Sequence, residues 1–332
     1  MIRHVVFPYP SSNSSVRARA LHWLERAVAQ GIVERAEVRL HGPGFTRRPI
    51  QRETPTLLLR NASRLTRGAR ESGILRQASP GVYDLDDGLP WDNGDLPDLG
   101  HWWKRPFPRS VVARRSATAA DRVIAGNDVI ADWASLHCDD VVVIPTCVEP
   151  SEYEQRTHWE LASSQPVLGW IGSPATELYL FDVADQLVES HRRFGTRLEI
   201  VSGPGRTPPS LAPFTTRRPW TPDAAQWICE WDIGLMPLRD GVYERAKCGY
   251  KLLQYAASGV PAIGSPVGVN ASLLDDMGGL APEAAEGWVD AIGQIVGESP
   301  SARGRRAASG LAVAQRYSYV QWQQQWLAAV GW

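Results

Sequence analysis

The stretch 231–270 combines residue types that suit the binding of a diphosphate. Gly249 precedes a predicted helix that starts near Tyr250 and Lys251, directly after a buried strand and a turn. A helix N-terminus leaves backbone N–H groups unpaired and carries a partial positive charge. Glycine lets a ligand approach the backbone, and Lys251 adds a full positive charge in the first turn. The pattern predicts a diphosphate at the helix start; a buried helix that carries a solvated lysine is the alternative.

Two further observations concern the same helix. Gln254 follows Lys251 by three residues, so it projects from the same face one turn deeper, where it suits a ribose hydroxyl. The chain has only three lysines, Lys104, Lys247 and Lys251, and two of them lie in this stretch. That concentration of lysine favours a charged binding site over a solvated surface.

The elements that position these residues alternate between strand and helix. Such an order is typical of parallel α/β sheets, in which ligands bind at the carboxyl ends of strands. Composition and length predict two domains, 1–160 and 161–317, followed by a last helix over 318–332. The expected strands are Val5–Phe7, Val38–Leu40, Pro80–Asp87, Asp121–Gly126, Val141–Ile144, Pro166–Ile171, Leu198–Val201, Trp231–Met236 and Val260–Ile263.

Three carboxylates end one of these strands. Asp84, Asp86 and Asp87 belong to the predicted strand Pro80–Asp87, and like charges at this spacing can raise the pKa of one of them. They suit the orientation of an acceptor hydroxyl, the role of a base, or a metal site. Capping of the following helix is the structural alternative.

Two polar loops follow other strands. The loop Ser11–Arg17, with Ser12, Asn13 and Arg17, is a candidate acceptor site, and a plain turn is the alternative. In the second half, Gly172 and Ser173 follow the first strand. Together with the Gly249–Lys251 region they could hold two ends of one diphosphate.

Two basic segments lie between the motifs. Arg47–Arg76 carries eight arginines and two glutamates, and His101–Arg109 interleaves aromatic and basic residues. A solvated helix face is the common interpretation of the first, and packing of Trp102 or Trp103 against the domain that of the second. The alternative is a surface that docks an anionic acceptor or a membrane.

Composition excludes several classes of protein. A pI near 6.7 indicates no global affinity for nucleic acid. The four cysteines are far apart and show no metal-ligand spacing, so we expect a reducing cytoplasm and no zinc site. No apolar run approaches about 18 residues, and the first residues do not form a signal peptide.

Several motifs resemble glycosyltransferase family 4, a large family of retaining enzymes with the GT-B fold. KCGYKLLQYAASGVPAIGSPVGVN, over Lys247–Asn270, is the strongest of them, and WIGSPATELYL resembles the start of the same half. GVYDLDD, DRVIAGND and VVVIPTCVEP resemble pieces of the N-terminal half in the right order.

This resemblance implies two facing Rossmann-like domains and a final helix, 318–332, that crosses back to the first domain. It implies a nucleotide-sugar donor in the C-terminal domain, an acceptor in the N-terminal one, and no metal or other cofactor. The loop Gly264–Asn270, with Val267 and Gly268, would pack near the nucleotide and sugar.

The chain departs from the family at two positions. Many members carry two glutamates where this chain has Ala246 and Gln254, and the loop Gly172–Thr176 lacks the basic residues that many members have there. Lys251 and Lys247 would replace that positive charge.

The resulting hypothesis is a glycosyltransferase that moves a sugar from a UDP-sugar or GDP-sugar donor to the hydroxyl of an unknown acceptor, with retention of configuration. The alternatives are a nucleotide-sugar 2-epimerase and a non-catalytic sugar-nucleotide-binding protein. We expect a cytoplasmic chain that can associate with the inner face of a membrane, and the basic segments mildly favour an anionic or membrane-associated acceptor. The expected site residues are Asp84, Asp86 and Lys251 for catalysis, Gly172, Ser173, Lys247, Gly249, Tyr250, Lys251, Gln254, Val267 and Gly268 for the donor, and Ser12, Asn13, Arg17 and Asp87 for the acceptor.

Overall fold

The computed structural model describes residues 3–7, 9–11, 13–42, 52–62, 66–92, 108–161 and 165–332. The chain divides into two compact units. Unit 1 comprises Met1–Cys147, Gly241–Cys248 and Tyr319–Trp332, and unit 2 comprises Val148–Asp240 and Gly249–Ser318. This grouping differs from the predicted boundaries at 148–160, which belong to unit 2, and at 241–248, which belong to unit 1.

Unit 1 is built on a six-stranded parallel sheet with the order β2-β1-β3-β4-β5-β6. Short apolar runs form its inner strands because both faces of a parallel sheet are covered by helices. The strands are β1 His4–Val6, β2 Arg39–His41, β3 Thr56–Leu59, β4 Gly81–Leu85, β5 Arg122–Ala125 and β6 Val141–Val143.

Strand β3 corrects one expectation. The basic region Arg47–Arg76 was interpreted as a helix face or a docking surface, yet it contains a fully buried strand next to the centre of the sheet. The run Thr56–Leu59 is apolar enough to pair with β1 and β4. This short run was not predicted as a strand because arginines surround it in the sequence.

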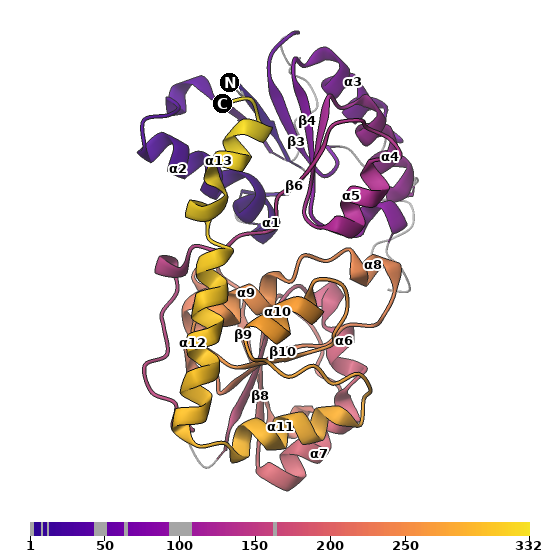
Figure 1. The fold of residues 1–332 in the computed structure, drawn as a ribbon. Coiled ribbons are helices and arrows are strands. Elements are labelled where there is room, and N and C mark those ends of the chain that lie inside the picture. Colours follow the sequence, from indigo (N-terminus) through magenta and orange to yellow (C-terminus); the bar gives the residue numbers. More distant parts are fainter. Residues whose placement is uncertain are drawn as a thin grey trace. The chain divides into compact units, whose positions relative to one another are not determined.

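The helices of unit 1 cover both faces of its sheet (Figure 1). One hydrophobic cluster includes residues of α2 and α13, and the other includes residues of α3, α4 and α5. The helices are α1 Ser14–Val16, a π-helical turn Arg17–Leu21, α2 His22–Ala29, α3 Ala69–Gln77, α4 Arg109–Ala119, α5 Asp128–Ala134 and α13 Tyr319–Ala329, with 3-10 turns at Arg35–Glu37 and Leu89–Trp91.

The last helix, α13, packs within unit 1. The ring of Trp326 stacks on Trp23 at a centroid distance of 5.4 Å, and Tyr319 donates its hydroxyl to the Ala18 carbonyl at 3.2 Å. The Arg122 guanidinium donates to the Ala328 carbonyl at 3.0 Å. The C-terminal segment is therefore part of the core of the first unit, as the sequence predicted.

Unit 2 is built on a five-stranded parallel sheet with the order β11-β10-β7-β8-β9. Its strands are β7 Val167–Ile171, β8 Arg197–Ser202, β9 Thr215–Pro219, β10 Ile233–Met236 and β11 Ala262–Gly264. Its helices are α6 Leu178–Phe181, α7 Ala184–Phe194, α9 Tyr250–Ala257, α10 Asn270–Asp276, α11 Gly287–Gly297 and α12 Pro300–Arg316, with 3-10 turns at Pro150–Glu152, Pro174–Thr176, Ala212–Phe214 and Ala224–Glu230. The short helix α8, Val242–Arg245, belongs to unit 1.

Helix α9 lies very close to β10. A Cβ on Gly234 would come within 2.5 Å of the Tyr255 ring, so only glycine permits this approach. The Tyr255 hydroxyl donates to the Leu235 carbonyl at 2.9 Å. These contacts fix α9 on the sheet and thereby fix the position of its N-terminus.

Candidate functional site

Gly249 forms the N-terminus of α9 in a conformation that only glycine adopts without strain. Its φ is +64°, in the left-handed region. A Cβ at this position would lie 2.4 Å from Leu273 Cδ1. Backbone conformation and packing therefore both require glycine at the start of α9, where the first-turn N–H groups have no partner within the helix.

Lys251 connects this helix start with the loop after β7. Its Nζ lies 5.2 Å from the ring centroid of Trp170, a cation–π contact. A Cβ on Gly172 would lie 2.9 Å from Lys251 Cε, so the lysine stem passes directly over Gly172. The two donor segments that the sequence predicted to act together, at Gly172 and at Gly249–Lys251, thus lie side by side at the carboxyl end of β7.

Ser173 lies at the exposed rim of the same loop. Its hydroxyl and that of Thr176 are 3.4 Å apart, and its carbonyl accepts from the Thr176 hydroxyl at 3.0 Å. The residue precedes the 3-10 turn Pro174–Thr176. Its exposed position allows its hydroxyl to contact a ligand held over Gly172.

Gln254 is almost fully buried one turn inside α9. Its side chain lies beside the hydroxyl of Tyr153, together with Tyr250, and burial raises the pKa of that hydroxyl well above its usual value. Tyr153 belongs to the segment that the sequence assigned to the linker, so it was not predicted. No sequence signal distinguishes it, because its proximity to Gln254 arises only from the fold.

Asn270 is a second residue that was not singled out. It opens α10, is 1% exposed, and neither side-chain atom has a hydrogen-bond partner among the described residues. Its Oδ1 would lie 3.4 Å from a Cβ on Gly249, so it borders the start of α9. Val267 is buried and Gly268 exposed in the loop before it, which was predicted to lie near the nucleotide. A buried amide without partners is costly, which marks this position as a candidate ligand contact.

The carboxylates of unit 1 have strong partners. Asp84 is fully buried and accepts two hydrogen bonds from the Arg19 guanidinium, at 2.9 and 2.8 Å. Arg19 also donates to the Ile144 carbonyl at 2.7 Å. Burial raises the pKa of Asp84 while Arg19 opposes that shift. Asp84 is therefore held in the core of unit 1 by its pair with Arg19, and its predicted catalytic role stays a prediction.

Asp86 and Asp87 belong to a second part of the same charged cluster. Arg60 donates to Asp86 at 2.7 Å and to the Ser15 hydroxyl at 2.9 Å, and lies 3.6 Å from Asp87. Lys247 Nζ lies 3.1 Å from Asp87 Oδ1. The three carboxylates are thus balanced by three cations.

Lys247 belongs to unit 1, where its ammonium pairs with Asp87, and its predicted contact with the donor stays a prediction. The predicted acceptor loop has a structural element of its own. Asn13 caps α1, because its side chain accepts from the backbone N–H groups of Ser15 and Val16 at 3.1 and 3.4 Å. Arg17 begins the π-helical turn, and Ser12 lies outside the described residues.

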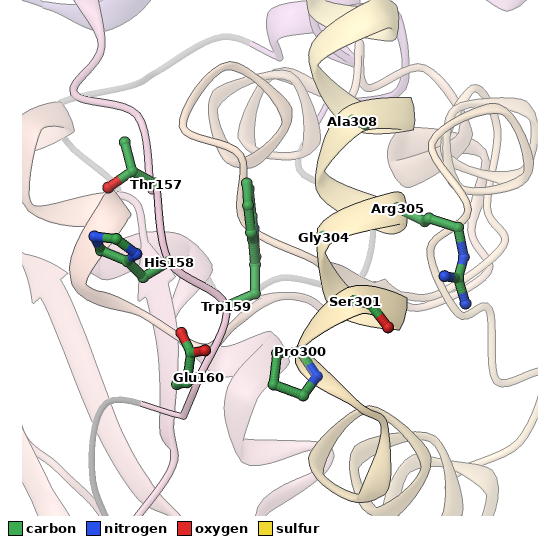
Figure 2. Close-up of a pocket in the computed structure, with 9 residues that line it drawn as sticks. All are labelled: Thr157, His158, Trp159, Glu160, Pro300, Ser301, Gly304, Arg305 and Ala308. Carbon is green, nitrogen blue, oxygen red and sulfur yellow. The ribbon is translucent and has the colours of Figure 1, made fainter.

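A separate hollow in unit 2 lies between the segment 157–160 and α12 (Figure 2). Figure 2 shows the Trp159 ring standing between this segment and the helix, and a Cβ on Gly304 would lie 3.2 Å from that ring. Arg303 donates to the Trp159 carbonyl at 2.7 Å. The residues around this hollow fasten the segment to α12, and none of them belongs to the predicted site.

One family model matches part of the chain. Residues 165–298, which contain the Gly172 loop, α9 and Asn270, match the model described as glycosyl transferases group 1. No curated protein matches the chain. Among the described residues, no helix is both long and apolar enough to cross a membrane.

Solved structures resemble the chain over most of its length. HepE from Anabaena, solved with UDP and glucose, is 14% identical with a TM-score of 0.69, and the match covers 99% of both chains. A UDP-forming α,α-trehalose-phosphate synthase from Burkholderia vietnamiensis is 12% identical with a TM-score of 0.57, over 85% of this chain and 75% of that one.

TarM from S. aureus, a mutant solved with fondaparinux, α-GlcNAc-glycerol and UDP, is 12% identical with a TM-score of 0.58. That match covers 83% of this chain, which spans 55% of the length of TarM. The two Rossmann-like units and these likenesses define the fold as GT-B.

Proposed function

We propose that this chain transfers a sugar from a UDP- or GDP-linked donor to an acceptor hydroxyl, with retention of configuration and without a metal ion. The observation that carries the proposal is the position of Lys251. Lys251 belongs to the first turn of α9, its stem passes over Gly172, and its ammonium lies over Trp170. A helix N-terminus and a lysine at one point form a site for a diphosphate.

The proposed chemistry follows from that charge. The leaving nucleoside diphosphate gains negative charge as the bond to the sugar breaks, and positive groups in place beforehand stabilise it. Lys251 and the backbone N–H groups at the start of α9 would supply this stabilisation. The leaving phosphate itself would assist removal of the acceptor proton on the same face of the sugar, which retains the configuration.

Gln254 and Asn270 would form hydrogen bonds with the parts of the donor other than the diphosphate. Gln254 lies one turn inside α9 beside Tyr153, which suits a contact with ribose. Asn270 offers an amide with unused donors and acceptors next to Gly249. HepE and TarM, both solved with UDP, support a uridine donor in a chain with the same fold.

The test is a panel of UDP- and GDP-sugars incubated with the protein, with hydrolysis and transfer measured in the presence and absence of EDTA. We expect turnover of at least one donor, insensitivity to EDTA, and a loss of about tenfold or more in Lys251→Ala. Arg305→Ala, which removes an exposed cation from α12, is the matched control. Equal turnover by wild type and Lys251→Ala would sink the assignment of Lys251.

One observation favours a binding-only protein as the second candidate. Ala246, at a position where members of glycosyltransferase family 4 often carry glutamate, is fully buried in the core of unit 1 and offers no carboxylate to a sugar. Calorimetry that shows donor binding, with no turnover on any acceptor, would support this candidate. Product analysis with donor alone would reveal a 2-epimerase.

A further inference from the structure

A groove of about 620 Å³ runs between α3 and α4 of unit 1, and none of its lining residues belongs to the proposed donor site. Ala69, Ser72, Gly73 and Arg76 of α3 line one side; their spacing places them on one helix face. The other side is formed by α4. Its lining residues are Arg114, Arg115 and Thr118.

Small side chains keep the groove open. A Cβ on Gly73 would meet no atom within 4 Å, so the space above the middle of α3 is empty of protein. From Ala69 to Arg76 the helix advances about 10 Å. The groove is therefore long enough for a ligand with more than one charged group.

Among the described residues that line the groove, the charged ones, Arg76, Arg114 and Arg115, are all arginines. Helices α3 and α4 carry five arginines and a single acid, Glu71. Glu71 is fully buried and accepts a hydrogen bond from the Ala62 backbone N–H at 2.7 Å, so it does not neutralise the outer surface. The whole chain has a net charge of −1, so this positive surface is a local feature and not a consequence of a basic protein.

One end of the groove is held in place before any ligand arrives. Arg115 donates to the Arg67 carbonyl at 2.9 Å. The Ser72 hydroxyl lies 2.8 Å from the Gly68 carbonyl and 3.2 Å from that of Arg115, and these contacts link α3 to α4. Arg76 and Arg114 are exposed and border the open space. The groove thus combines a fixed wall with two solvent-facing guanidinium groups.

We propose that the α3–α4 groove binds a phosphate-bearing anionic ligand. Guanidinium groups match the oxygens of phosphate in a two-pronged geometry, and hydroxyls such as that of Thr118 supply further hydrogen bonds. The concave shape and its small-residue floor suit a ligand that enters the groove rather than a flat surface. The site does not rest on the proposed transfer reaction, because it lies on other elements and is tested by binding alone.

Calorimetric titration of the full chain with inorganic tripolyphosphate tests the proposal. We expect the double variant Arg76→Gln/Arg114→Gln to bind at least about tenfold more weakly than wild type. Gly73→Leu keeps every charge and fills the groove, so it is expected to weaken binding to a similar extent while circular dichroism shows an unchanged fold. Binding to the wild type is expected to weaken as salt is added.

The control is Arg192→Gln/Arg305→Gln, which removes the same charge from exposed positions on α7 and α12 of unit 2 and is expected to bind as wild type does. Lys251→Ala is expected to keep the groove binding. Loss of tripolyphosphate binding in Lys251→Ala but not in the arginine variant would assign the anion to unit 2 and overturn the proposal. A different result would be that the protein binds no tripolyphosphate but sediments with phosphatidylglycerol vesicles, and that this sedimentation requires Arg76 and Arg114. That result would overturn the proposal and identify this face as a membrane-docking surface.

Discussion

The ammonium of Lys247 lies 3.1 Å from Asp87 Oδ1 in unit 1, although Lys247 precedes Lys251 of unit 2 by only four residues. The short segment Gly241–Cys248 is held in unit 1 by this pair and by Asn127, whose amide donates to the Ala246 carbonyl at 2.9 Å. The chain then returns to unit 2 at Gly249. Two lysines that are neighbours in sequence thus serve different parts of the molecule.

Removal of the Lys247 ammonium is expected to destabilise the protein. In Lys247→Met, Asp87 keeps only the more distant Arg60, at 3.6 Å, as a charged partner among the described residues. We expect a loss of about 1–3 kcal/mol in the free energy of unfolding, because a largely buried carboxylate is left undercompensated. Urea denaturation measures the loss, and Lys247→Met/Asp87→Asn should recover part of it. A single variant as stable as wild type would contradict the structural role of the pair.

Acid is expected to weaken the same cluster. Burial alone would raise the pKa of Asp87, but Lys247 and Arg60 lower it well below its usual value. Its contribution to stability is therefore complete above the unfolded pKa of about 3.9 and is lost as pH falls below it toward the folded pKa. Between pH 7 and pH 3, the free energy of unfolding should fall less in Asp87→Asn than in wild type. If the two proteins lose stability with the same dependence on pH, Asp87 is not a source of the acid sensitivity.

Gly249→Ala is expected to combine two penalties. The left-handed φ strains any Cβ, and this Cβ would also overlap Leu273. We expect a loss of about 2–4 kcal/mol and weaker binding of UDP. Gly278→Ala is the matched control, because Gly278 has a φ of +63° and open space around its Cβ position. If both variants lose the same stability in thermal unfolding, the Leu273 contact does not define the start of α9.

Asn270→Leu is expected to separate stability from binding. Leucine has a similar size and removes the unsatisfied buried amide, so we expect the ligand-free protein to gain up to about 1 kcal/mol. We expect the same change to weaken binding of a UDP-sugar by about tenfold, since the amide would pair with the donor. Chemical denaturation and calorimetry measure the two effects. Unchanged affinity would show that Asn270 does not contact the ligand.

Much of the fold could be predicted from the sequence because local pattern determines it. Apolar runs ending in glycine or proline marked most strands, and the predicted strand Trp231–Met236 differs from β10, Ile233–Met236, only at its start. Strand β3 was missed because its three leucines, Leu57 to Leu59, lie among arginines. Strand β9, Thr215–Pro219, was missed because an edge strand needs few apolar residues.

The sequence by itself determined the alternation of strands and helices, and it placed Gly172, Gly249 and Lys251 at the ends of strands and helices where parallel sheets bind ligands. The tertiary structure decided which charges meet. It paired Asp84 with Arg19 and Lys247 with Asp87, and it brought Lys251 over Gly172. The physical reason is that periodicity depends on neighbours along the chain, whereas an ion pair forms between side chains that only the packed sheet and its helices bring within reach.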